Sequence, residues 1–506
     1  MKRELAALAD REHDLLVVGG GIHGAAAAWD AAQRGLAVAL VEAADFGSGT
    51  SWNSLKTIHG GLRHLQRADL RSLRESVRER AALLRIAPEL VRPLSFLLPL
   101  YGHGLHGRVA MTAGLLAADL LSAGRNDGLP PSHRIPRSRV LSPQEVRQRV
   151  PDLDPRGLTG GAWWTDAQVD SSERLLVGFL HAAADAGAVM ANRVEVTALR
   201  RKDARVAGAL VRDREGRGTL EVRSRMVLNA GGPWSEAVAA TAGIAKQPDP
   251  RLRAVNLVLR RRLVDRHALG GRGDGRYLFL VPWRDRSIVG TGYEAAEPPT
   301  VDGGIEAFLA EAKRAYSWAG LERADVALVH RGLVPGHGGP AGLLTRGRVV
   351  DHESEDGLPG LVSVRSVKYT TARASAEAAV DLVLRRLERR AAPCRTAATP
   401  LTRARPLSGT LAERARIAAR DEMALHLTDA VLRRLDLGTA GAPAPEDVET
   451  VARAMGAELG WDQARIEHEK AGVCAAYAAD GSVRDDLSEA QGGSGGCGAP
   501  PSLKSE

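Results

Sequence analysis

Residues 15–24 read LLVVGGGIHG, and this stretch decides the fold. Four apolar residues, typical of a buried strand, lead directly into the pattern G-x-G-x-x-G formed by Gly19, Gly21 and Gly24. The first glycine permits a tight turn, the second lets the backbone approach a pyrophosphate, and the third allows a helix to pack closely on the strand. The pattern therefore predicts a dinucleotide site, with the pyrophosphate at the positive N-terminus of the helix.

The residues that follow complete a strand–helix–strand unit. An alanine-rich helical pattern over residues 22–34 ends at Gly35, and residues 38–41 form a second apolar strand that closes on Glu42. A carboxylate at this position can accept hydrogen bonds from both hydroxyls of an unphosphorylated ribose. Both NAD and FAD carry such a ribose, so this unit predicts a dinucleotide without choosing between them.

Size and composition narrow the class of protein. The 506-residue chain is too long for one compact domain, and its 44% hydrophobic and 26% charged residues are typical of a soluble globular protein. The net charge of +8 is explained equally well by an arginine-rich composition or by attraction to a phosphorylated substrate, a dinucleotide or an acidic membrane surface. Only 4% of the residues are aromatic and no dense basic run is present, so no nucleic-acid partner is expected.

Cysteine usage and apolar runs exclude several other classes. The three cysteines have no metal-ligand spacing and are too few for a disulfide framework, so no metal site is predicted. Residues 1–11 are charged and lack the apolar core of a secretory signal. The longest apolar stretch, residues 109–123, contains Asp119 and is shorter than a membrane span, so it predicts a packed helix.

Two further segments favour FAD over NAD. Residues 229–234, NAGGPW, end a strand with small residues and look like the second flavin-contacting turn of FAD-dependent oxidoreductases. Thr50 and Ser51 lie just beyond the first unit, where such proteins place hydroxyl groups on the FAD phosphates. The sequence therefore predicts FAD as the cofactor.

Residues 54–63, SLKTIHGGLR, resemble the segment of the flavin-linked glycerol-3-phosphate dehydrogenases that passes beside the isoalloxazine ring. The likeness spans roughly residues 13–480 and recurs at VPW 281–283, GT 290–291, LTR 344–346, KYTT 368–371, DEMAL 421–425, LRR 432–434 and ELGW 458–461. The resemblance implies oxidation of glycerol 3-phosphate, or of a close small hydroxy compound, to dihydroxyacetone phosphate by hydride transfer to flavin N5. Electrons would pass to a quinone or to oxygen.

The same resemblance assigns the site. It places Arg63, Arg346 and Asn256 at substrate-binding positions, and makes His64 and Lys368 the candidate catalytic residues. Lys368 also precedes a helix start whose N–H groups would stabilise the anionic reduced flavin. The predicted cofactor contacts are Gly19, Gly21, Gly24, Glu42, Thr50, Ser51, Ser54, His59, Gly60, Val194, Gly231, Gly232, Trp234, Lys368 and Thr370.

The pocket departs from the family pattern at several positions. His64 stands where the family has tyrosine, Asn256 where it has histidine, Val334 where it has arginine, and Ser366-Val367 where it has Gly-Gly. His64 either serves as base or phosphate donor or only fills the volume of the tyrosine, so the general base is left open. Two alternatives follow: an FAD-dependent oxidase of another 2-hydroxy or amino acid, and a flavin-binding protein without this activity.

The expected fold class is α/β, with an FAD-binding Rossmann-like domain, an inserted β-rich substrate domain and a C-terminal helical domain. The expected ranges are 1–95, 150–245 and 345–395 for the first, 96–149 and 246–344 for the second, 396–488 for the third, and a disordered tail over 489–506. Dehydrogenases of this family are peripheral on the inner face of the bacterial membrane, which implies a cytoplasmic protein with a peripheral membrane contact. The sequence leaves a homodimer open.

Overall fold

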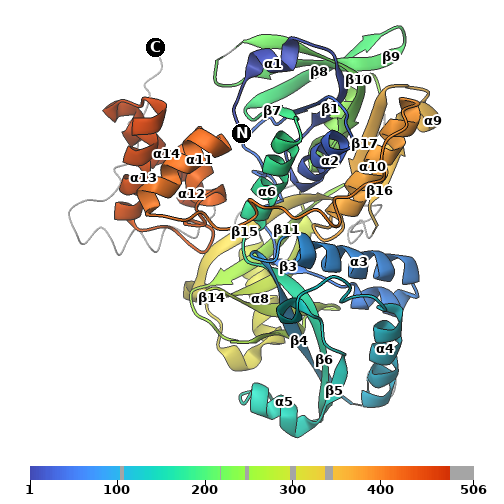
Figure 1. Cartoon of the computed structure of the whole chain (residues 1–506). Coiled ribbons are helices and arrows are strands. Elements are labelled where there is room, and N and C mark those ends of the chain that lie inside the picture. The colour runs from blue at the N-terminus through green and yellow to red at the C-terminus, as the bar shows by residue number, and fades with distance from the viewer. Residues whose placement is uncertain (103–106, 217, 245–249, 297–303, 337–345, 479–506) are drawn as a thin grey trace.

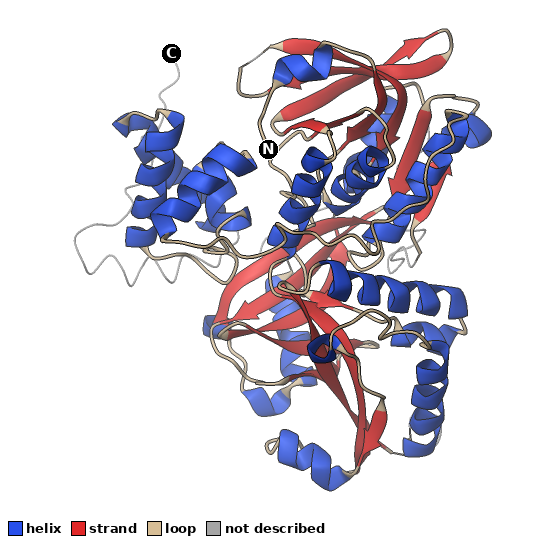
Figure 2. Ribbon diagram, in the orientation of Figure 1, coloured by secondary structure: helices blue, strands red, loops and turns tan. Residues whose placement is uncertain are grey.

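The structure is a computed structural model that describes residues 1–102, 107–216, 218–244, 250–296, 304–336 and 346–478. Two large sheets lie one above the other, and a separate group of helices stands beside the upper sheet (Figures 1 and 2). These three parts match the expected fold class: a cofactor domain of α/β type, a β-rich second domain and a C-terminal helical domain.

The upper sheet is built around the predicted dinucleotide unit. Its strands follow the order β16-β17-β10-β1-β2-β7, and all neighbours are parallel except β16, which runs antiparallel to β17. Strands covered on both faces need continuous apolar runs, which explains the sequences of β1 and β2. The bounds are β1 His13–Val18, β2 Val38–Val41, β7 Val189–Ala191, β10 Thr219–Asn229, β16 Arg348–Asp351 and β17 Leu361–Arg365; β8 Val194–Lys202 and β9 Arg205–Asp213 extend it from β10.

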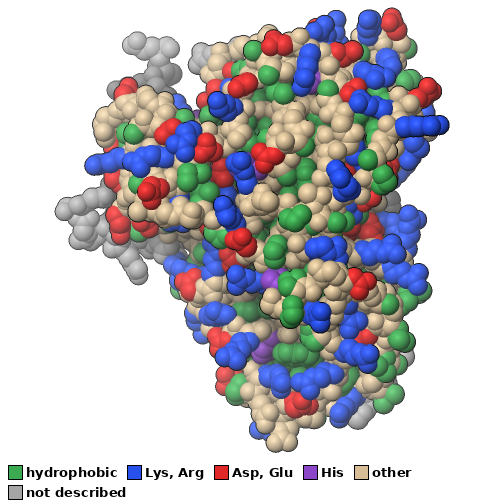
Figure 3. All heavy atoms as spheres, in the orientation of Figure 1, with side chains coloured by type: hydrophobic (Ala, Val, Ile, Leu, Met, Phe, Trp, Pro, Cys, Tyr) green, Lys and Arg blue, Asp and Glu red, His purple; other side chains and the backbone are tan. Residues whose placement is uncertain are grey.

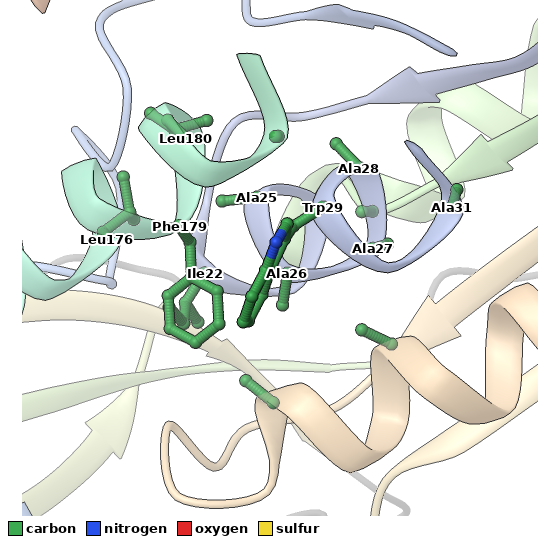
Figure 4. Close-up of a cluster of buried hydrophobic side chains, with 14 of the residues drawn as sticks. Ile22, Ala25, Ala26, Ala27, Ala28, Trp29, Ala31, Leu176, Phe179 and Leu180 are labelled. Atoms are coloured by element: carbon green, nitrogen blue, oxygen red, sulfur yellow. The ribbon is translucent and has the colours of Figure 1, made fainter. Parts of the chain in front are cut away.

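Three helices pack on one another over this sheet: α2 (Ile22–Gln33), α6 (Ser172–Asp185) and α10 (Ala372–Arg386). The alanines of α2 keep its surface shallow, so both neighbouring helices approach it closely (Figure 4). Trp29 fills the remaining space, and its ring meets Phe179 of α6 edge-on with 5.5 Å between centroids. The short helices α1 Leu5–Ala9, α7 Ser235–Ala240 and α9 His352–Asp356 flank the same sheet.

The lower sheet follows the order β15-β11-β14-β13-β12-β4-β6-β3, with β5 paired to β6. Its strands are β3 Thr57–Ile58, β4 Val91–Tyr101, β5 Arg139–Leu141, β6 Leu158–Val169, β11 Arg251–Leu259, β12 His267–Arg272, β13 Tyr277–Trp283, β14 Arg286–Ala295 and β15 Val326–Pro335. Around it lie α3 Leu70–Ile86, α4 Arg108–Leu121, α5 Pro143–Arg149 and α8 Ile305–Ala315. The stretch 109–123 therefore forms a helix, as predicted, although Val109, Leu116 and Leu120 stay exposed.

Two stretches expected in the cofactor domain belong to the lower sheet. Residues 57–58 and 158–169, expected in the cofactor domain, are strands of the lower sheet, because β6 pairs antiparallel with β4 along its whole length from Val91–Val169 to Tyr101–Leu158. A strand's sheet is decided by its long-range partner, which the local pattern does not contain. Nearby, β7 and β8 are separated by Asn192 and Arg193, and the φ of Arg193 is 57°.

The helical domain consists of α11 Leu411–Glu422, α12 Leu427–Arg433, α13 Pro445–Leu459 and α14 Gln463–Ala478. The expected disordered tail, residues 489–506, lies outside the described residues. Among the helices in the described ranges, none combines the length and apolar character needed to cross a bilayer. Lys and Arg side chains are spread over the face seen in Figure 3, with Asp and Glu among them.

One carboxylate lies inside the helix layer. Asp30 of α2 is 1% exposed, and burial raises its pKa to about 6 although an ion pair with Arg34 at 3.4 Å opposes the shift. At about 1.4 kcal/mol per pH unit, ionised Asp30 costs the fold roughly 3 kcal/mol above that pH. Because the folded pKa lies above the unfolded one, this cost is present at neutral pH and disappears as the pH falls below about 4.

We expect Asp30→Asn to raise the free energy of unfolding at pH 7.5 by up to roughly 3 kcal/mol and to lose this advantage near pH 4. Denaturant unfolding at a series of pH values measures the difference from wild type. Asp381→Asn is the matched control, because Asp381 pairs with the same Arg34 but its side chain is 45% exposed. A difference between Asp30→Asn and wild type that stays constant over the whole pH range would contradict the account.

Candidate functional site

A cavity of about 2080 Å³ opens between the two sheets. Its walls come from the glycine turn after β1, the loop after β2, the end of β10, the strands β11, β13 and β14 of the lower sheet, and residues 366–370 before α10. The carboxyl ends of β1, β2 and β10 meet here, which is where ligands bind in open parallel sheets. The predicted cofactor and substrate regions therefore share one space.

The glycine turn is shaped for close backbone approach. Gly19 has a φ of 106°, and a Cβ there would lie 2.7 Å from the carbonyl oxygen of Ala230. A Cβ on Gly24 would overlap the carbonyl oxygen of Gly19, so Gly24 fixes α2 against the turn and does not itself line the cavity. Gly21 does line it, and among the described residues other than its chain neighbours the nearest atom to a Cβ built there is Ser51 Oγ, at 3.2 Å. The helix start therefore faces the cavity with the Ser51 hydroxyl beside it.

The polar groups around this turn suit a dinucleotide. Ile22 N–H donates to Ser51 Oγ (3.1 Å), so the hydroxyl stands at the N-terminus of α2, where a phosphate would bind. His23 Nε2, also in the cavity wall, is buried and has no hydrogen-bond partner among the described residues. Such an orphaned polar atom fits a ligand group at this point. The residues present therefore fit the pyrophosphate end of FAD.

Glu42 stands at the end of β2 as predicted. Its carboxylate accepts from Gly20 N–H (2.6 Å) and Ala44 N–H (2.8 Å), and Glu42 lines the cavity. Burial raises the pKa of Glu42, while these two N–H donors oppose the shift. The carboxylate is thus held in place by backbone donors at the position where a ribose would lie.

Most predicted contact residues meet on this cavity. The cavity wall contains Gly19, Gly21, Glu42, Thr50, Ser51, Ser54, His59, His64, Val194, Gly231, Gly232, Trp234, Asn256, Lys368 and Thr370. Residues 42–51, which follow β2, are called the cofactor loop. Thr50 Oγ1 donates to the carbonyl of Leu333, so its hydroxyl links this loop to the lower sheet. Trp234 is 46% exposed and its ring lies over Gly49. Gly60 is outside the wall, since its N–H donates to Asp166 beneath it (2.7 Å).

The two predicted catalytic residues touch each other. Lys368 Nζ donates to His64 Nε2 over 2.8 Å, and His64 Nδ1 lies 3.9 Å from Asp69 Oδ2. Lys368 is a cation on the cavity wall, and its contact with the imidazole links it to the N-cap of α3.

A second imidazole, His59, is oriented by a buried carboxylate that the sequence analysis missed. His59 Nδ1 donates to Asp166 Oδ2 (3.4 Å), and Arg80 donates to Asp166 Oδ1 (2.6 Å). Burial alone would raise the pKa of Asp166, but the hydrogen bond from His59 and the charge of Arg80 outweigh it and lower the pKa. In the sequence, Asp166 is distinguished only as the one charged residue of AWWTDAQV, residues 162–169, a pattern that does not reveal its partners.

The substrate-binding predictions have different outcomes. Asn256 is 1% exposed on β11, and its Oδ1 accepts from Thr291 Oγ1 (2.8 Å) at the cavity wall. Arg346 is not part of the wall: its guanidinium is half exposed and pairs with Asp69 at 2.7 Å. The side chain of Arg63, on the 3₁₀ turn Leu62–Arg67, lies outside what the structure describes. Val334 does line the cavity and packs beside Ala254 and Val367, so the wall is apolar there.

Comparisons with known proteins identify relatives of the whole arrangement. Residues 14–382 match the family described as FAD dependent oxidoreductase, and residues 389–466 match the C-terminal domain of alpha-glycerophosphate oxidase. The chain is 34% identical to a glycerol-3-phosphate dehydrogenase of Synechocystis sp. over 80% of this chain and 76% of that protein. It is 33% identical to one of Mycobacterium leprae over 76% of this chain, and it spans 65% of that protein's length.

Solved structures show the same fold. A glycerol-3-phosphate dehydrogenase from Bacillus halodurans, complexed with FAD, superimposes with a TM-score of 0.68 at 21% identity, covering 93% of this chain and 95% of that one. Glycine oxidase from Bacillus cereus superimposes with a TM-score of 0.53 at 20% identity, covering 74% of this chain and 98% of that one.

The glycine turn offers a direct test of the cofactor site. We expect Gly24→Ala to weaken FAD binding at least about tenfold, or ~1.4 kcal/mol, because the added Cβ must push α2 away from the turn. Fluorescence titration of the FAD-free protein measures the affinity. Gly218→Ala is the control, since a Cβ there meets nothing within 4 Å. Equal FAD affinity in the two variants would be incompatible with the assigned role of the turn.

Proposed function

Since the chain belongs to the FAD-dependent glycerol-3-phosphate dehydrogenase family, we propose that it oxidises glycerol 3-phosphate to dihydroxyacetone phosphate. When bound, FAD supplies the acceptor for the hydrogen that leaves the secondary carbon as hydride. The final electron acceptor would be a quinone or oxygen. The protein has to bind a dianionic substrate, hold its hydroxyl group and take up one proton.

The observation that carries the proposal is the Lys368–His64 contact on the cavity wall. A phosphorylated substrate needs a fixed cation, and the Lys368 ammonium is held by the 2.8 Å bond to His64 Nε2. That bond occupies the Nε2 lone pair, while Nδ1 lies toward Asp69. We therefore assign His64 the task of orienting Lys368 toward the substrate.

His59 is better placed to take the hydroxyl proton. Asp166 carries negative charge, which favours the tautomer with a proton on Nδ1 and a lone pair on Nε2. The His59 side chain is 46% exposed and lines the cavity. In this assignment Nε2 accepts the hydroxyl proton, and Asp166 stabilises the resulting imidazolium, as a carboxylate does beside a catalytic histidine.

Asn256 and the apolar wall complete the pocket. Asn256 Oδ1 is engaged by Thr291, which leaves the amide N–H₂ as a donor for a substrate oxygen. Val334 lines the cavity where the family pattern has an arginine, and it carries no charge. Binding of the substrate phosphate therefore depends more on Lys368. The alternative of an amino-acid oxidase is supported at the level of the fold alone, and the match to the glycerophosphate oxidase C-terminal domain favours the glycerol phosphate reading.

The proposed function predicts that glycerol 3-phosphate bleaches the visible flavin band of the purified protein under anaerobic conditions. Glycerol and inorganic phosphate, added separately, should leave the band unchanged, because neither combines the secondary alcohol with the charged group that Lys368 binds. Flavin reduction by glycine or a 2-hydroxy acid, with no response to glycerol 3-phosphate, would replace the proposal with an oxidase of those compounds. A band that only dithionite bleaches would indicate a flavin protein without this activity.

The same assay separates the roles of the residues. Asp166→Asn should retain FAD and slow flavin reduction by roughly a hundredfold, because His59 loses the group that orients it. Asp154→Asn is the matched variant, since Asp154 also lines the cavity but pairs with the exposed Arg156. A rate for Asp166→Asn equal to that of Asp154→Asn would rule out His59 as the base.

A further inference from the structure

The loop between β2 and Ser51 has one side toward the cavity and one side toward the helical domain. Glu42, residues 43–44 and residues 47–51 line the cavity, whereas Asp45 and Phe46 do not. Asp45 is 0% exposed and Phe46 is 1% exposed. Phe46 packs against Gly20 of the glycine turn, where a Cβ would lie 2.5 Å from its ring. Whatever holds these two residues therefore sets the position of the cofactor loop.

Asp45 is held by the helical domain. Its Oδ2 accepts from Arg433 Nε (2.6 Å) and from Arg434 (3.0 Å), and its Oδ1 accepts from a second nitrogen of Arg434 (2.7 Å). Arg434 is thus a two-pronged partner of the carboxylate, the strongest geometry that this pair of groups offers. Both arginines stand at the end of α12, far along the sequence from the loop they hold.

The same cluster holds the second segment of the site. Asn192 donates to Asp45 Oδ1 (3.0 Å) and to the carbonyl of Met423 (2.8 Å). Arg193 pairs with Asp429 of α12 at 2.6 Å. Through the backbone, Arg193 N–H donates to Ala44 O (2.8 Å), and Val194 N–H donates to Glu42 O (2.7 Å). The helical domain thus contacts Asp45 on one side and residues 192–193 on the other. These two segments flank Glu42, whose carboxylate is predicted to bind the ribose.

The charges in this cluster depend on one another. Burial alone would raise the pKa of Asp45, but the charges of Arg434 and Arg433 outweigh it and hold the pKa well below its usual range. Removing one partner leaves a buried charge without compensation, which is far more costly than loss of a surface pair. Asp45, Asp429, Arg433 and Arg434 are each at most 8% exposed, so water cannot replace a lost partner.

We propose that α12 is a working part of the FAD site: Arg433 and Arg434 position the cofactor loop through Asp45, so FAD binding and docking of the helical domain are coupled. Coupling of two equilibria is reciprocal, so FAD must tighten the docking as much as docking tightens FAD binding. The proposal requires only that the chain binds FAD, and it stands or falls independently of glycerol 3-phosphate oxidation.

The test compares two substitutions that each remove one contact between the helical domain and the rest of the protein. Arg434→Met removes the two-pronged contact with Asp45. Arg284→Met removes a different contact of the helical domain, the ion pair between Arg284 and Asp436 at 3.2 Å. Arg284 lies in the turn between β13 and β14 of the lower sheet and does not line the cavity. FAD affinity is measured by fluorescence titration of the full-length protein, together with the melting temperature before and after FAD addition.

We expect the FAD dissociation constant of Arg434→Met to exceed that of Arg284→Met by about tenfold or more, even where the two lower the melting temperature equally. A smaller difference would mean that both contacts serve only general stability, and would overturn the proposal. If Arg434→Met does not fold, Asp45→Asn is judged by the same criterion, because it keeps the shape of the side chain and removes its charge. Arg434→Lys, which keeps the charge without the planar fork, should lie between wild type and Arg434→Met.

Discussion

The carboxylate of Asp45, buried and shared by Arg433 and Arg434, is the interaction on which the arrangement of the cavity depends. It joins residues almost four hundred positions apart in the chain and lies directly behind the loop that follows β2. Without it, the loop carrying Ser51 would lose its contact with α12 and keep only those with the glycine turn, residues 193–194 and the lower sheet. The helical domain thus supports the nucleotide site from behind, although none of its described residues lines the cavity.

Other buried ion pairs also join distant segments of the chain. Lys56 and Glu173 pair at 2.8 Å with both side chains at most 1% exposed, and Arg174 pairs with Glu422 at 2.6 Å. Such pairs add little net stability over apolar packing, but they penalise any arrangement that leaves one partner alone. Arg174, like Arg433 and Arg434, therefore serves a contact between the cofactor domain and the helical domain.

Local patterns in the sequence were sufficient for the first unit of the fold. The pairing of β1 with β2, the approach of Gly24 to Gly19 and the hydrogen bond from Gly20 to Glu42 all lie within thirty residues, so this unit could be predicted from its own sequence. The second sheet needed information that no local pattern contains, because β6 is defined by β4 rather than by its own residues. Most of the predicted cofactor residues therefore meet on the cavity wall, while residues 158–169, expected in the cofactor domain, form β6 of the lower sheet.

The site shows the same division between local and long-range information. His64 and Lys368 were named from motifs, but their mutual contact and the role this suggests for each appear only in three dimensions. The sequence did not identify Asp166 and Asp45 as functional residues, because a single acidic residue indicates no role until its partners are known. Arg346 was assigned to the substrate from its motif, yet the structure pairs it with Asp69 outside the cavity wall.

Hydrogen exchange with and without FAD tests the central claim, that the helical domain and the nucleotide site form one unit, most directly. The account predicts that FAD slows amide exchange in residues 42–51 and equally in α12 and Arg434, while α5, which packs on β5 and β6 and does not line the cavity, exchanges unchanged. Protection confined to residues 42–51, with α12 exchanging at the same rate in both states, would contradict it.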